Sequence, residues 1–140
     1  MSIYDVFSGG NRPFDKEEWA AAKQAQRKEA YELIDNTCSE MMASGDSFRQ
    51  YLDVQGRFER YSVANAILVS AQMPEATQLK EYSKWKASRV YVNKDAQKII
   101  ILEPSKEYTR EDGTKGVSYN AKVVYDISET SAKDRQQEQE

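Results

Sequence analysis

Residues 14–44 contain neither glycine nor proline, and no other feature limits the possible folds of this chain as strongly. Asp15 can serve as an N-cap, with Glu18 in the capping-box position. Small and apolar side chains recur at steps of three and four residues between Ala30 and Met41. We therefore predict one long helix that turns a single stripe toward a core and ends before Gly45.

Three further helices are expected before residue 88. Their predicted N-caps are Asp46 or Ser47, Ser62, and Thr77. Residues 63–72 are apolar nearly all round, which is typical of a helix buried among other elements, and Pro74 stops this segment. The last helix is predicted to run from Thr77 to about Ala87.

After Ser88 the pattern changes to one that favours β-structure. Strands are predicted near 90–92, at 98–103 and at 119–127, with a turn at Asp112-Gly113. The expected fold class is α+β, in which a helical N-terminal half of about four helices packs on a small three-stranded antiparallel sheet. Residues 1–13 are expected to be a flexible N-terminus, 14–128 one domain, and 129–140 a linker or disordered tail.

Missing residue types narrow the function. The 140 residues include no histidine and a single cysteine, Cys38. Histidine metal sites and Ser-His or Cys-His nucleophiles are therefore excluded, and Cys38 is interpreted as a small core residue. No paired acids lie at a spacing that suggests a hydrolase. We expect no catalytic residues, no metal and no cofactor.

No apolar run approaches the length of a membrane span, and the start of the chain lacks the features of a signal peptide. A cytoplasmic protein that does not associate with membranes is expected.

Basic residues are concentrated in the middle of the chain, although the formal net charge is −3. Residues 57–98 hold eight basic and four acidic side chains, and five aromatic residues lie among them: Phe58, Tyr61, Tyr82, Trp85 and Tyr91. Cations that follow phosphates, combined with rings on which bases stack, are typical of single-strand binding. The segment therefore suggests unpaired DNA as a partner, although a solvated surface beside core aromatics would give the same composition.

Residues 57–77 resemble the N-terminal domain of ArdC-like antirestriction proteins. The shared pattern is F-x-x-Y-S-x-x-N-x-x-L-I-x-x-Q-x-P-x-A-T, and weaker similarity continues through 85–104 and 123–130. The resemblance implies a single-stranded-DNA-binding domain of an LtrC-like mobile-element protein, carried by a plasmid or conjugative transposon. It also implies a C-terminal zinc metallopeptidase-like domain, which these 140 residues do not contain.

The sequence departs from this family at two places. The family usually has a glycine before the position of Arg89, where this chain has Ser88. The family's Lys-Gly-Glu-Lys turn is replaced by residues 94–98, which include no glycine. The absence of glycine disfavours a close approach of this turn's backbone to a phosphate.

Ten residues are candidates for DNA contacts. They are Arg57, Arg60, Tyr61, Asn65, Gln72, Trp85, Lys86, Arg89, Lys94 and Lys98. Asn65 and Gln72 can either project into a groove with Tyr61 or satisfy backbone groups at the helix ends. Trp85 can be a stacking platform or a core residue. The four cations from Lys86 onward can contact phosphates or only keep the surface soluble.

A different class of function is also compatible with the sequence. The domain could dock a downstream enzyme or partner protein through its acidic first helix, with Glu29 and Glu32 in the contact surface.

Overall fold

The computed structural model describes residues 15–132 and begins with the predicted long helix, α2 (Lys16–Ala43). The Asp15 carboxylate caps it by accepting hydrogen bonds from the backbone N–H groups of Glu17 and Glu18, at 2.9 and 3.2 Å. Cys38 is half-buried on this helix. The predicted N-terminal segment 1–13 lies outside the described residues.

The next two helices, α3 (Gly45–Arg57) and α4 (Val63–Gln72), form a corner with the end of α2. Ser62 caps α4 as predicted, since its hydroxyl accepts from the N–H of Asn65. The predicted caps of α3 were wrong. Ser44 is the N-cap instead, because its backbone is extended and its side chain accepts from the N–H of Ser47.

The fourth helix is shorter than predicted. Thr77 does not cap it, and Leu79–Lys80 forms strand β1 before α5 (Tyr82–Ala87) begins. The physical reason is tertiary. Leu79 and Lys80 pair with Asp126 and Tyr125 of a strand far along the chain, which local propensity does not reveal.

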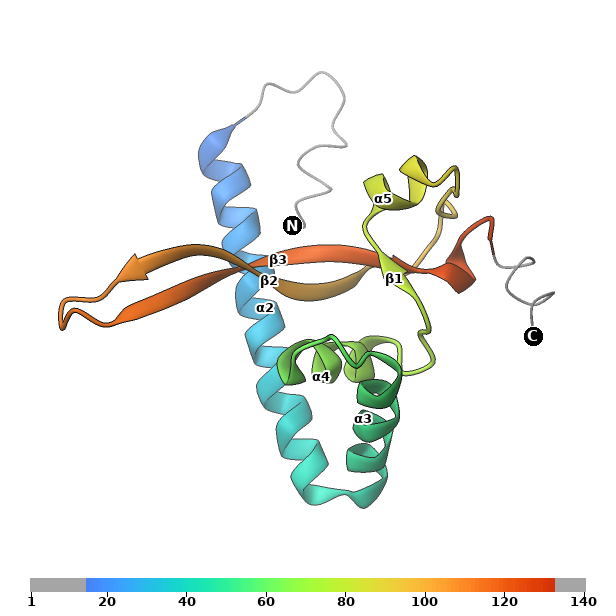
Figure 1. Ribbon diagram of the computed structural model, residues 1–140, viewed down its shortest axis with the longest axis horizontal. Helices are drawn as coiled ribbons and strands as arrows, with labels where there is room; N and C mark the ends of the chain where they lie inside the picture. The colour runs from blue at the N-terminus through green and yellow to red at the C-terminus, as the bar shows by residue number, and fades with distance from the viewer. Residues whose placement is uncertain (1–14, 133–140) are drawn as a thin grey trace.

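A long hairpin completes the sheet. Strand β2 (Ile99–Thr109) pairs antiparallel with β3 (Lys115–Asp126), from Ile99 opposite Val124 to Thr109 opposite Lys115. The predicted turn lies at its tip, where Gly113 adopts a φ of +86° that favours glycine. Both strands extend several residues past the predicted segments, so the tip projects beyond α2 (Figure 1).

The segment around residues 90–92 is not a strand of the sheet. Val92 forms only an isolated bridge with Thr130, after the short 3-10 helix η1 (Ile127–Glu129). Thr130 and Ala132 are buried in this contact, although the predicted tail began at residue 129. The domain therefore continues at least to Ala132, and residues 133–140 lie outside the described part.

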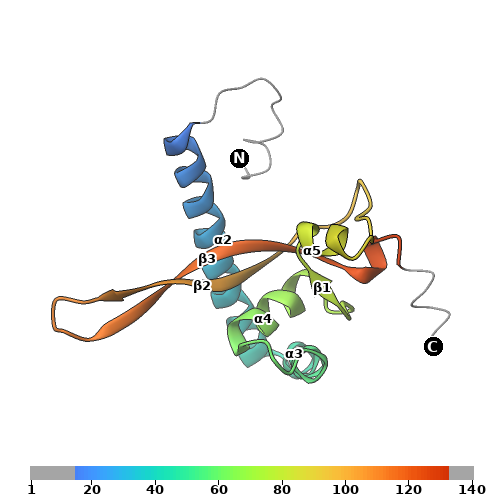
Figure 2. The same cartoon turned by 45° about the horizontal axis from the view of Figure 1, so that its top comes forward.

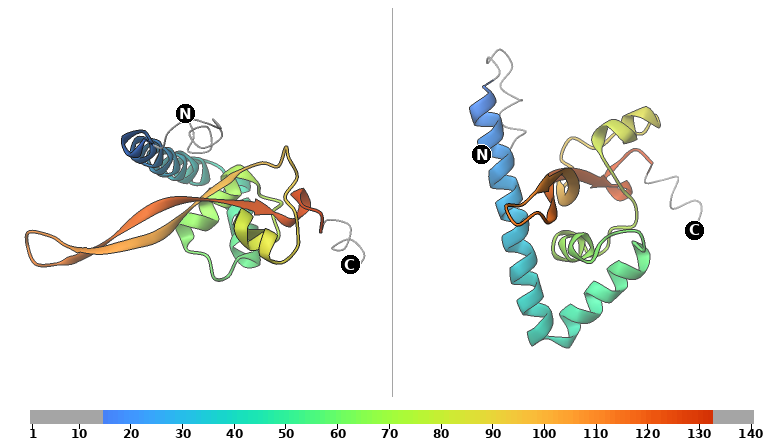
Figure 3. Two further views of the ribbon diagram at one scale, coloured as in Figure 1. Left: turned by 90° about the horizontal axis from the view of Figure 1, so that it is seen from above. Right: turned by 60° about the vertical axis from the view of Figure 1, so that its left-hand side comes forward.

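The sheet has the order β1-β3-β2 and is covered on both faces. Ile99, Ile101 and Val124 pack against α3 and α4, whereas Val123 and Tyr125 pack against Trp85 of α5. Helices α3 and α5 consequently lie on opposite sides of the sheet (Figures 1 and 2), and α2 crosses the hairpin (Figure 3).

The predicted fold class is confirmed: the described residues form an α+β fold with a helical N-terminal half, four helices and a three-stranded antiparallel sheet. Between residues 15 and 132 no helix is both long and apolar enough to cross a membrane.

Candidate nucleic-acid interface

The two amides of α4 bind the outer edge of β2. Asn65 Nδ2 donates to the Leu102 carbonyl at 2.8 Å, and Asn65 Oδ1 accepts from the Leu102 N–H at 2.8 Å. Gln72 does the same with Ile100, at 2.8 and 2.9 Å. These amides take the place of a neighbouring strand along β2, so the side chains of Asn65 and Gln72 are not available for DNA contacts.

Trp85 is a core residue. Only 2% of it is exposed, and it packs with Val90, Val123 and Tyr125. Its indole N–H donates to the Tyr125 carbonyl at 2.9 Å, which satisfies the single polar atom of the ring. The proposed stacking role for Trp85 is therefore ruled out, because no base can reach its face.

Three further candidates lie on the α3–α4 side of the sheet, away from α5. Tyr61 is half-buried against Phe58, with 4.9 Å between the ring centroids, and burial raises the pKa of its phenol. The Arg57 guanidinium donates to the Pro74 carbonyl, and Arg60 is exposed. The structure therefore does not bring these residues together with the cations of α5.

The remaining candidates lie in one continuous segment between β1 and β2, residues 82–98, which we call the basic segment. It leaves β1 as α5, continues as a loop past the end of β3, and enters β2 (Figure 1). Five basic side chains and one acidic side chain give it a net charge of +4. Its exposed cations include four predicted site residues, namely Lys86, Arg89, Lys94 and Lys98.

The sequence prediction did not place the aromatic surface of the basic segment correctly. Its exposed rings are Tyr82 and Tyr91, with 53% and 60% of each residue accessible. The signal for Tyr91 was present in the sequence, because Tyr91 stands between Val90 and Val92, which both pack in the core. Tyr82 could not be assigned from the predicted helix, since its register depended on a wrong starting residue.

Arg89 occupies the left-handed position in the backbone turn that ends α5. Its φ is +61°, and it is the one non-glycine residue between 15 and 132 with a positive φ. The Val90 N–H donates to the Trp85 carbonyl and the Arg89 N–H to the Lys86 carbonyl, both at 2.9 Å. This pattern is a Schellman cap, whose left-handed position normally favours glycine. The left-handed residue is thus Arg89 itself and not the preceding Ser88.

Replacing Arg89 by glycine is expected to stabilise the protein modestly. A side chain in the left-handed region costs about 1–2 kcal/mol, and the extra freedom of glycine in the unfolded state offsets part of the gain. Urea unfolding should show a free energy of unfolding up to about 1 kcal/mol higher for Arg89→Gly. Arg89→Ala, which removes the same guanidinium without relieving the strain, should show no such gain, and equal stabilities would contradict the assignment.

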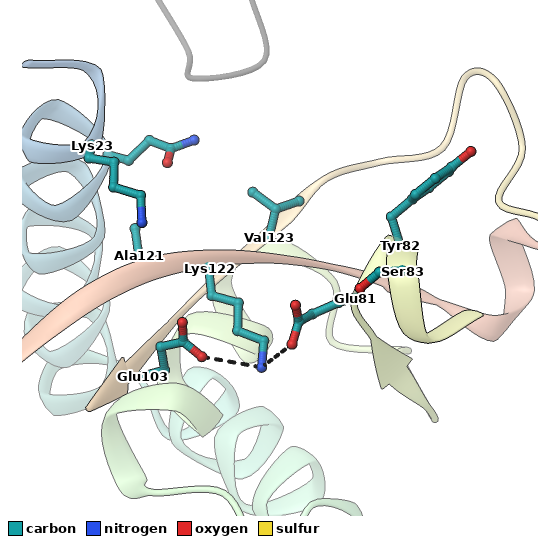
Figure 4. Close-up of a pocket in the computed structure, with 9 residues that line it drawn as sticks. Lys23, Glu81, Tyr82, Ser83, Glu103, Ala121, Lys122 and Val123 are labelled. Carbon is teal, nitrogen blue, oxygen red and sulfur yellow. Dashed lines mark ion pairs between the residues drawn. The ribbon is translucent and has the colours of Figure 1, made fainter. Parts of the chain in front are cut away.

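On the edge of β3 that faces away from β2, a cavity of about 340 Å³ lies beside the start of α5. Lys122 reaches from β3 to two carboxylates at this cavity, Glu81 at 2.7 Å and Glu103 at 3.4 Å (Figure 4). Burial alone would lower the pKa of the Lys122 ammonium, but the two carboxylates outweigh burial and raise it. The ammonium neutralises only one of the two carboxylates, so this group of three side chains keeps one negative charge.

Within residues 15–132, no three histidine, cysteine or acidic residues are grouped so that they could hold a metal ion. Searches of known protein families, of curated proteins and of solved structures found no match to this chain. The resemblance to ArdC-like domains accordingly stays a prediction from the sequence.

Proposed function

We propose that this domain binds single-stranded DNA through the basic segment. The observation that carries the proposal is the exposure of Tyr82 and Tyr91 within a segment of net charge +4. Exposed rings offer faces on which unpaired bases stack, while neighbouring cations attract the phosphates. A duplex keeps its base faces stacked inside, so such a surface favours a single strand.

Two features of the fold support this arrangement. The packing of Trp85, Val90 and Val92 anchors the basic segment to the sheet, so its exposed side chains project from a fixed base. Lys84 contacts Glu81 at 3.9 Å, but both side chains are partly exposed, so this pair offsets little of the positive charge. The surface is therefore both cationic and aromatic.

Fluorescence anisotropy with a labelled oligonucleotide tests the proposal directly. The full 140-residue chain is expected to bind a single strand with micromolar-class affinity and to bind the same sequence as a duplex more weakly. Affinity should fall as salt increases, because phosphate contacts release counterions. Undetectable binding, or equal affinity for the two forms, would contradict single-strand recognition.

The double variant Tyr82→Ala/Tyr91→Ala is expected to lose about tenfold or more of the single-strand affinity. Each stacked base contributes roughly 1–3 kcal/mol, and about 1.4 kcal/mol corresponds to a factor of ten. Tyr108→Ala is the matched control, because Tyr108 is also an exposed tyrosine but lies on the hairpin that projects past α2. A comparable loss in the control would show that the rings of the basic segment are not special.

The wider biological role comes from the sequence resemblance. On that basis we propose that the domain belongs to an ArdC-like antirestriction protein of a mobile element, joined in the full-length protein to a metallopeptidase-like domain and acting in the cytoplasm without catalytic residues of its own. The alternative, protein docking through α2, predicts that reversing Glu29 and Glu32 abolishes partner capture while neutral Lys86 and Arg89 have no effect.

A further inference from the structure

The cavity beside α5 exposes an open strand edge. The backbone N–H and C=O groups of Ile100 and Leu102 point away from β3, toward the amides of α4. In an antiparallel pair, the backbone groups of the residues opposite them, Val123 and Ala121, therefore point to the other edge of β3. Strand β1 covers that edge only at Tyr125 and Asp126. Among the described residues no strand lies beside Ala121 and Val123 there, and both line the cavity.

Gln26 of α2 also lines this cavity. Only 6% of the residue is exposed, but its amide atoms are not among the buried side-chain atoms of residues 15–132 that lack a partner, so they remain accessible from the cavity. At the opposite edge of the sheet, the side-chain amides of Asn65 and Gln72 bind the backbone of β2. Gln26 is therefore placed as a donor and acceptor for a ligand.

The remaining walls fit an aromatic heterocycle. Tyr82 is at the start of α5 on one side, and Lys23 of α2 is on the other (Figure 4). Glu81 and Glu103 are directed toward Lys122 in the same view, and the two lysines of the lining together balance these two carboxylates. The cavity thus combines a ring face, an uncommitted amide, backbone donors and acceptors, and one cation at its border.

We propose that this cavity holds one unpaired nucleobase of the bound single strand. The edge of the base would hydrogen-bond with the Gln26 amide and with the backbone of Ala121 and Val123, while its ring lies against Tyr82. This inference rests on the proposed function, because Tyr82 links the cavity to the basic segment. It adds a site that contacts base edges to a surface that otherwise contacts phosphates and ring faces.

The test compares two labelled oligonucleotides on the full chain, an ordinary thymidine strand and an abasic strand of equal length. Gln26→Met keeps the length of the side chain and removes the amide. It should weaken binding to the thymidine strand about fivefold and leave binding to the abasic strand unchanged. Gln24→Met, an exposed position on the same helix, is the matched control and should change neither affinity.

The outcomes separate this inference from the proposed function. If the wild-type protein binds the thymidine strand and Gln26→Met binds it equally well, the base site is overturned while single-strand binding stands. If the wild-type protein binds no single strand, both proposals fall. Backbone amide shifts of Ala121 and Val123 in NMR spectra give a second measurement. Shifts induced by an extended peptide but not by the thymidine strand would assign the cavity to strand addition and overturn the base site.

Discussion

Replacing Asp126 by alanine is expected to lower the free energy of unfolding by about 3–5 kcal/mol, one of the largest effects that a single substitution can have in this protein. Only 2% of Asp126 is exposed. One carboxylate oxygen accepts from the N–H groups of Thr77 and Gln78, at 2.9 and 3.1 Å, and the other accepts from the backbone and hydroxyl of Ser128. The side chain thereby joins the segment before β1 to the segment after β3.

Alanine would leave the donors of both segments without this acceptor. Strand β1 has only two residues, so few other interactions keep it paired with β3. Thermal unfolding should show a midpoint at least about 10 °C lower. Asp126→Asn should be intermediate, because the amide retains one acceptor oxygen and sets a donor against Ser128 or Thr77. Asp95→Ala, at an exposed position, should stay within about 0.5 kcal/mol of the wild type. A loss below about 1 kcal/mol for Asp126→Ala would mean that water replaces the carboxylate.

The second large effect is expected at the amides of α4. Asn65→Leu should lower the free energy of unfolding by about 2–4 kcal/mol, and Gln72→Leu by a similar amount. Each amide satisfies one N–H and one carbonyl of β2, so each substitution leaves two backbone groups without a partner. Leu102 is buried, which makes replacement by water unfavourable there.

Hydrogen exchange gives this prediction its specificity. The amide protons of Leu102 in Asn65→Leu, and of Ile100 in Gln72→Leu, should exchange faster than those of Ile99 and Ile101, which bond to β3. Gln97→Leu is the control, because it removes a single exposed hydrogen bond to the Gln72 carbonyl and should cost less than about 1 kcal/mol. Unchanged exchange at Leu102 would show that the Asn65 amide does not protect the strand edge.

The hydrogen bonds behind these two predictions involve residues on which the family resemblance depends. Asn65, Gln72 and Asp126 all belong to the segments that resemble ArdC-like domains, and each makes hydrogen bonds that hold the sheet together. A shared pattern of two amides in α4 and an acid at the end of β3 is therefore compatible with a structural role as well as with DNA contact. The candidate cations that retain an accessible surface are those of the basic segment, together with Arg57 and Arg60 on the other side of the sheet.

Local chemistry alone determined much of this fold. The stretch without glycine or proline before Gly45 specified α2, and Ser62 and Pro74 bounded α4. The glycine at position 113 marked the hairpin turn. These signals could be recognised because helix caps and helix breakers act within a few residues. The positive charge of the central segment was likewise visible without coordinates.

Only the tertiary structure decided which groups remain available for function. Trp85 became core and Tyr82 surface because α5 starts after β1, and β1 exists through its pairing with β3 some forty-five residues later. Asn65 and Gln72 were committed to β2 for the same kind of reason, since the edge that they cover is formed by a distant part of the chain. Pairing between residues far apart in sequence leaves no local signal, so no periodicity could reveal it.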